Sequence, residues 1–329
     1  MPCSNHRADE LVRRGKAVRR FNRGIFYIKL TEREEGVVQP VVVGIDPGSK
    51  KEGFTVKSSK HTFLNIQADA VTWVKENEER STMMRRGRRN RNCPCRQPKL
   101  NRKHGGMSPS IRARWGWKLR IARWLAKMYP ISTFVVEDIC APTKQRQNKW
   151  NRSFSPLEVG KNWFYLELAS IAFVITKQGW ETKNERDRLG LKKLSNKMSS
   201  RFEAHCVDSW ALANMIVGNH FVPDDKQVLF IAPFRFHRRQ LHVLQPKKGV
   251  RKPHGGTMSL GIKRGTWIKY KDIGLCYVGG NMNGKISLHS MSNGKRLTKY
   301  AKVSDCILGT RSSWRLWTER SHIDVSSGF

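Results

Sequence analysis

Two short apolar runs that each end in acidic residues are the clearest pattern along the chain. The run "VVVGI" (41–45) leads into Asp46, and "ISTFVVED" (131–138) ends in Glu137 and Asp138. Continuous apolar character predicts strands that are buried on both faces, which makes "VVVGI" a central strand. The β-branched and aromatic segments "GFTVKSS" and "HTFLNIQ" predict a hairpin that follows it. The pattern therefore predicts an α/β fold in which two strands deliver carboxylates to their ends.

Apolar residues at helical spacing predict several helices. In "SIRARWGWKLRIARWLAK" they form one apolar stripe that consists of Trp117, Ile121, Trp124 and Leu125, typical of core packing. Residues 161–179 are expected to form an amphipathic helix that stops at Gly179.

A later helix carries polar side chains on a face of its own. "SSRFEAHCVDSWALANMIVG" predicts a helix from about Ser200 that ends at Gly218, with an apolar stripe of Phe202, Cys206, Ala213 and Val217. A different face repeats at i, i+3, i+4 and i+7 and carries His205, Asp208, Ser209 and Leu212.

Short alternating segments at near-regular spacing dominate the last hundred residues. "TWIKY", "LCYVGG", "KISLHS", "LTKYA" and "DCILGTR" predict strands, and Asn-Gly pairs at 283–284 and 293–294 predict hairpin turns. This spacing favours a small antiparallel β-barrel. The segment that enters it is basic and contains interleaved Phe and His, which suits gripping a nucleic-acid backbone and stacking on bases.

Charge narrows the possible partners. The chain of 329 residues contains 63 Lys and Arg against 26 Asp and Glu, a net charge of +37. Such an excess repels itself unless a polyanion neutralises it, and nucleic acid is the expected polyanion. A basic membrane-surface protein is the alternative, but we find neither an apolar span of about 18 residues nor a signal peptide. We therefore expect a cytoplasmic, nucleoid-associated protein.

Arginines concentrate in one segment, and cysteines do not form a framework. "MMRRGRRNRNCPCRQPKLNRK" lacks acidic residues, and its like-charged neighbours destabilise a helix unless an anion intervenes. A solvated helix face is the plainer interpretation. Seven cysteines spread over the chain predict reduced thiols, and Cys93 with Cys95 is only half of a zinc motif.

Three acids that meet in a fold need a cation to compensate their mutual repulsion. Mg²⁺ is the natural choice because it prefers carboxylate oxygens, water and phosphate as ligands. Two such ions can activate water and stabilise a leaving oxygen, with His205 positioning or deprotonating the water. Taken singly, the same residues have plainer roles: an Asp-Pro-Gly turn, a helix cap at Glu137 and a structural histidine.

In this order, "GIDPG", an arginine-rich segment, "VVEDI" and "HCVDSWALA" resemble the split RuvC motifs of the transposon-encoded, RNA-guided (OMEGA) nuclease family containing IscB and IsrB. The resemblance implies an RNase H-like core in which Asp46, Glu137 and Asp208 bind two Mg²⁺ ions and His205 assists. Mn²⁺ is expected to substitute for Mg²⁺. It also implies a monomeric ribonucleoprotein with a noncoding guide RNA and a double-stranded DNA target, in which base pairing selects the sequence.

The resemblance assigns a role to each part of the chain. It implies a truncated PLMP-like arm at 1–39, RuvC segments at 40–79, 104–160 and 161–220, an arginine-rich bridge helix at 80–103, and at 221–329 a β domain for the RNA scaffold and target-adjacent motif. The expected nucleic-acid contacts are Arg85, Arg86, Arg88, Arg89, Arg91, Arg96, Arg102, Lys103, Arg235, Arg238, Arg239, Lys247, Lys248, Arg251 and Lys252.

One departure from IscB bears on the reaction. Residues 138–204 contain no His-Asn-His constellation, so the HNH nuclease of IscB has no counterpart there. A single nuclease centre predicts a nickase that cuts the non-target strand, as in IsrB. Two alternatives stay open: a guide-independent, structure-specific nuclease that resembles RuvC resolvases, and a nucleic-acid-binding protein without catalysis.

Overall fold

The computed structural model describes residues 3–22, 25–34, 36–93, 107–140, 156–196, 198–218, 221–234, 240–242 and 253–319. The chain divides into two units, Val38–Val228 and Pro2–Val37 together with Leu229–Phe329. Among the described helices, none combines the length and apolar character needed to cross a membrane.

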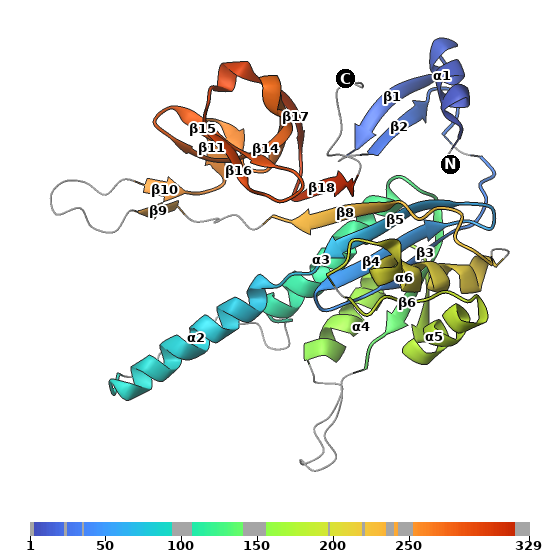
Figure 1. Ribbon diagram of the computed structural model, residues 1–329, viewed down its shortest axis with the longest axis horizontal. Helices are drawn as coiled ribbons and strands as arrows, with labels where there is room; N and C mark the ends of the chain where they lie inside the picture. The colour runs from blue at the N-terminus through green and yellow to red at the C-terminus, as the bar shows by residue number, and fades with distance from the viewer. Residues whose placement is uncertain are drawn as a thin grey trace. The chain divides into compact units, whose positions relative to one another are not determined.

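A mixed β-sheet forms the centre of the first unit (Figure 1). Within this unit its strands follow the order β5-β4-β3-β6-β7, so the apolar run "VVVGI" lies in an interior strand with a neighbour on each side, as predicted. Antiparallel pairing joins β3 to β4 and β4 to β5, whereas β3 pairs with β6, and β6 with β7, in parallel. The strands are β3 (Val41–Asp46), β4 (Lys51–Lys57), β5 (Thr62–Asp69), β6 (Ile131–Asp138) and β7 (Phe173–Gln178). The predicted α/β fold and the predicted hairpin are confirmed.

Helices cover both faces of this sheet. Successive residues of β4 face opposite sides of the sheet, and each contacts a different helix. Gly53 lies against the backbone carbonyl of His205 in α6, whereas the carboxylate of Glu52 binds Lys118 of α3. In Figure 1, α6 lies in front of the strands and α3 behind them. The helices of this unit are α2 (Trp73–Asn90), α3 (Pro109–Ala126), α4 (Pro156–Ala169), α5 (Gly179–Arg188) and α6 (Phe202–Val217).

The helix predicted at 161–179 is wrong. Helix α4 ends at Ala169, β7 occupies Phe173–Gln178, and α5 begins at Gly179. The β-branched run in β7 pairs in parallel with β6, and this pairing outweighs the helical periodicity. Gly179 begins a helix instead of stopping one, because Gln178 and Glu181 form a capping box there.

Two further predictions need correction. The arginine-rich helix predicted at 80–103 spans Trp73–Asn90, and residues 94–106 lie outside the described part. Helix α6 is not amphipathic: every residue from Phe202 to Asn214 except Glu203 is buried, because the sheet and neighbouring segments enclose it. The apolar stripe of α3 is confirmed, since its four predicted residues are all buried.

An antiparallel sheet of five strands forms the largest part of the second unit, in the order β16-β15-β14-β13-β17. The predicted Asn-Gly turns join β14 to β15 and β15 to β16, with positive φ at Asn283, Gly284 and Gly294. Closure into a barrel stays a prediction. The strands are β13 (Thr266–Tyr270), β14 (Gly274–Met282), β15 (Lys285–Ser290), β16 (Arg296–Ala301) and β17 (Cys306–Arg311).

Shorter elements complete the second unit. A helix and hairpin make up the N-terminal arm, and the helix ends shortly before Gly15, which has a positive φ. The other strands pair antiparallel as β8 with β18, β9 with β10 and β11 with β12. These elements are α1 (Asn5–Arg13), β1 (Ala17–Asn22), β2 (Ile25–Leu30), β8 (Val228–Pro233), β9 (Gln240–His242), β10 (Pro253–Gly255), β11 (Met258–Ser259), β12 (Ile262–Lys263) and β18 (Trp314–Thr318).

Candidate metal centre

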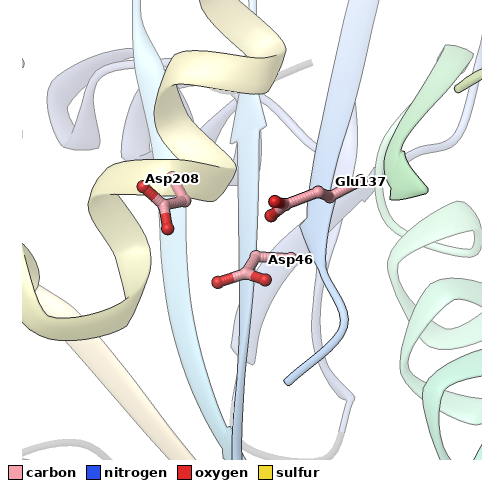
Figure 2. A group of neighbouring side chains, drawn as sticks. All are labelled: Asp46, Glu137 and Asp208. Atoms are coloured by element: carbon pink, nitrogen blue, oxygen red, sulfur yellow. The ribbon is translucent and has the colours of Figure 1, made fainter. Parts of the chain in front are cut away.

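Three carboxylates from distant parts of the chain converge at one edge of the central sheet (Figure 2). One oxygen from each of Asp46, Glu137 and Asp208 lies within 4.8 Å of the others. Strands β3 and β6 run in parallel, with Ile45 opposite Val136, so the acids that follow emerge at the same edge. These are the three residues predicted as metal ligands, and the structure brings them together.

Close contact between α6 and the sheet places the third carboxylate. An added Cβ on Gly44 would lie 1.9 Å from the backbone oxygen of Ser209, and one on Gly53 would lie 2.4 Å from that of His205. Two glycines thus let the helix backbone approach the strands. The Ser209 hydroxyl also lies 2.9 Å from that of Thr55 on β4. Asp208, which precedes Ser209, is thereby held over the end of β3.

Electrostatics at this cluster favour either protons or an added cation. Burial, followed by the charges of Glu137 and Asp208, raises the pKa of Asp46 well above its usual value. Burial and the nearby charge of Asp208 likewise raise the pKa of Glu137. The cluster is thus difficult to ionise fully, and a divalent cation would relieve the repulsion.

The donor set fits Mg²⁺ or Mn²⁺. All three groups are carboxylates, the hard oxygen ligands that Mg²⁺ prefers. Asp208 is 3% exposed, and its two carboxylate oxygens pair with Arg186 and Lys193. His205 lies one helical turn before Asp208 and is 8% exposed. It is not a member of the three-residue cluster, and its assisting role stays a prediction.

The neighbouring acid Asp138 has a different role. It accepts hydrogen bonds from Tyr165 and Gln178 and pairs with Lys161 at 2.8 Å. Burial raises its pKa, but these hydrogen bonds outweigh that effect and lower the pKa of Asp138. Asp138 therefore anchors α4 and β7 to the end of β6, while Glu137 joins the cluster.

Sequence reasoning missed three residues that surround the carboxylates. Arg186 and Lys193 both pair with Asp208, and an added Cβ on Gly179 would lie 2.8 Å from Oε1 of Glu137. The two cations belong to a polar region whose pattern gave no signal. Gly179 was assigned to a helix end, and only the misassigned β7 could have indicated that it faces Glu137.

The predicted nucleic-acid contacts divide into described and undescribed residues. Five of them lie in α2 or directly after it, where the second half of the helix contains no acidic residue: Arg85, Arg86, Arg88, Arg89 and Arg91. The other predicted contacts lie outside the described residues: Arg96, Arg102, Lys103, Arg235, Arg238, Arg239, Lys247, Lys248, Arg251 and Lys252. Cys93 is exposed, and Cys95 also lies outside the described part.

Comparisons with known proteins give one family match and several structural similarities. Residues 1–153, a little under half of the chain, match the family model described as RRXRR protein. No curated protein sequence matches the chain. A structure of T. thermophilus RuvC in complex with a Holliday junction substrate shares 13% identity at a TM-score of 0.30, over 55% of this chain and 98% of that one.

Two more solved structures are similar at the same level. A second Thermus thermophilus RuvC structure shares 14% identity at a TM-score of 0.29, over 53% of this chain and 90% of that one. The yeast mitochondrial Holliday junction resolvase shares 14% identity at a TM-score of 0.27, over 54% of this chain and 78% of that one.

Proposed function

We propose that this protein is an RNA-guided DNA endonuclease that nicks the non-target strand by divalent-metal-dependent phosphodiester hydrolysis. The observation that carries the proposal is the convergence of Asp46, Glu137 and Asp208 at one edge of a mixed sheet. The RRXRR match over residues 1–153 supports a nuclease of this kind, and the excess of basic residues supports a nucleic-acid partner.

The carboxylates and His205 would have different roles in hydrolysis. Asp46, Glu137 and Asp208 would hold two Mg²⁺ ions, or Mn²⁺ in their place. When bound, such ions lower the pKa of a water ligand and neutralise charge on the phosphate. His205 would accept a proton from the attacking water as the new P–O bond forms. The bond between phosphorus and the leaving oxygen then breaks, and the leaving oxygen takes up a proton from solvent, so that one new strand end carries the phosphate and the other a hydroxyl.

A single centre supports cutting of one strand. Within the residues that the structure describes, Asp46, Glu137 and Asp208 are the one cluster of His, Cys, Asp or Glu suited to a metal ion. Together with the lack of a His-Asn-His constellation at 138–204, this favours nicking over double-strand cleavage.

The guide RNA would occupy the arginine-rich and C-terminal parts. Helix α2 would act as the bridge helix, and the β domain at 221–329 would contact the RNA scaffold and the target-adjacent motif. Replacement of any α2 arginine by glutamine should lower the slope of log affinity against log salt for RNA by about one. A slope that stays constant across the series would make α2 a solvated surface.

Plasmid nicking by the purified ribonucleoprotein tests the function. RNA that copurifies is sequenced, and a supercoiled plasmid with the matching sequence is incubated with the complex and Mg²⁺. We expect open-circular product, which Asp46→Asn abolishes and Asp138→Asn preserves, because Asp138 lies at the same strand end but outside the cluster. Linear product would contradict a nickase.

The same experiment separates the alternatives. A preparation that is free of RNA yet cuts branched DNA would identify a structure-specific nuclease. Full RNA and DNA binding without any cleavage in Mg²⁺ or Mn²⁺ would identify a binding protein.

A further inference from the structure

Both carboxylate oxygens of Asp208 already face a cationic side chain. Nε of Arg186 lies 2.7 Å from Oδ1, and Nζ of Lys193 donates a hydrogen bond to Oδ2. A Mg²⁺ ion must approach one of these oxygens to about 2.1 Å. Because like charges repel strongly at such distances, a bound ion competes with at least one of the two side chains.

The two cations differ in how easily they can leave. Arg186 belongs to helix α5, and its side chain is 15% exposed. Lys193 lies between α5 and α6 on a segment without regular structure, and its side chain is 39% exposed. Its ammonium group sits on a flexible four-carbon stem. Of the two cations, Lys193 therefore has the side chain that can move away from Asp208 more easily.

Hydrogen bonds and packing on both sides of Lys193 hold its backbone in place. The amide of Leu191 donates to the carbonyl of Arg186 at 2.8 Å, and that of Leu194 donates to the carbonyl of Glu203 at 3.0 Å. Leu191 also packs against the buried cluster that contains Phe202. Only the side chain of Lys193 needs to move, and its ammonium group stays within reach of the metal centre.

We propose that Lys193 exchanges partners during the reaction, leaving Asp208 when the divalent ion binds and then contacting the phosphate of the strand to be cut. This inference rests on the proposed nuclease function. After the ammonium group of Lys193 leaves Asp208, the phosphate of the incoming strand becomes its new anionic partner. Charge-assisted hydrogen bonds to phosphate are strong. Arg186 remains on Asp208 and acts as a positioning residue.

A Lys193 that exchanges partners affects metal binding and nicking in opposite directions, because it opposes the metal ion and promotes the reaction. A lysine with a purely structural role would not do this. We expect Lys193→Met to bind Mn²⁺ about two- to fivefold more tightly, the range that loss of one partly exposed ion pair gives. The same variant should nick DNA about tenfold more slowly at saturating Mg²⁺. If Lys193 only held Asp208 in place, both metal affinity and nicking would fall.

The test measures Mn²⁺ affinity by electron paramagnetic resonance on the full chain without nucleic acid, and nicking on the ribonucleoprotein. Lys192→Met is the matched control, because Lys192 is the exposed neighbour, and it should change neither quantity. Lys193→Gln serves as a second variant, and thermal unfolding confirms that each variant folds.

Each outcome bears on a different claim. Unchanged or weaker Mn²⁺ binding by both Lys193 variants would overturn the competition, and undiminished nicking would overturn the phosphate contact. If the unaltered chain binds no Mn²⁺ at this cluster and Asp46→Asn leaves nicking unchanged, the proposed function itself fails.

Discussion

Replacing Gly44 with alanine should damage both the fold and the metal centre. The new Cβ would lie 1.9 Å from the backbone oxygen of Ser209, whereas real contacts of this kind stay beyond 3.0 Å. Helix α6 would have to move by about 1 Å, because a carbonyl fixed in a helix cannot rotate away. Overpacking usually costs about 1–3 kcal/mol, and opposed backbone atoms place Gly44→Ala at about 3 kcal/mol.

The displacement also reaches the site. Asp208 adjoins Ser209 and would move with it, and a misplacement of about 1 Å typically lowers a rate by about a hundredfold. Denaturant unfolding measures the free energy of unfolding, and Mn²⁺ titration and plasmid nicking report on the site. We expect all three to decline together in Gly44→Ala.

Gly116 in α3 provides the control. There an added Cβ would come no closer than 4.0 Å to the ring of Trp163, which is an ordinary contact. Gly116→Ala should therefore raise the free energy of unfolding by about 0.5–1 kcal/mol, as expected within a helix. The reasoning is refuted if Gly44→Ala unfolds at the same denaturant concentration as the parent and binds Mn²⁺ equally well.

Three further predictions follow from contacts around the sheet. Gly179→Ala should weaken Mn²⁺ binding severalfold with little change in unfolding, because its Cβ would press on the Glu137 carboxylate at 2.8 Å; equal affinity by titration would contradict this. Lys118→Met should lower the free energy of unfolding, measured with denaturant, by about 3–5 kcal/mol, because the buried carboxylate of Glu52 loses its partner. Adding Glu52→Gln to this variant should restore much of the lost stability. Burial and neighbouring carboxylates raise the pKa of Asp46 in the folded chain. The folded chain therefore binds this proton more tightly than the unfolded chain does, and the proton stabilises the fold at low pH. Unfolding measured without metal should show this stability lost as pH rises above 3.8, the usual pKa, through the higher folded value. Asp46→Asn, or saturating Mg²⁺, should remove this loss of stability with rising pH. If the free energy of unfolding of Asp46→Asn depends on pH in the same way as that of the parent, the titration of Asp46 is not its cause.

The sequence indicated the central sheet and the carboxylates at its strand ends because both depend on local patterns, whereas the full set of Asp46, Glu137 and Asp208 followed from the resemblance to the split RuvC motifs. A continuous apolar run such as "VVVGI" requires burial on both faces, and a strand has a defined end at which Asp46 must emerge. The parallel pairing that brings Glu137 beside Asp46 was not visible locally, but two buried strands with acidic ends made it the simplest arrangement.

The remaining features depend on tertiary contacts that no local pattern records. Strand β7 was taken for a helix because its residues continue the apolar spacing of α4, and only pairing with β6 decides between the two structures. Arg186 and Lys193 lie in a polar region, and many exposed cations have the same local sequence context. Their approach to Asp208 follows from the packing of α5 and α6, not from spacing along the chain.

Anomalous scattering from crystals of the full chain soaked in Mn²⁺ tests the central claim most directly. A divalent cation held by the three carboxylates should give an anomalous peak within about 2–2.5 Å of oxygens of Asp46, Glu137 and Asp208. The peak should vanish in Asp46→Asn and persist in Asp138→Asn. A fully soaked crystal with no peak there, or with peaks only at other acidic residues, would contradict the metal centre and the nuclease function built on it.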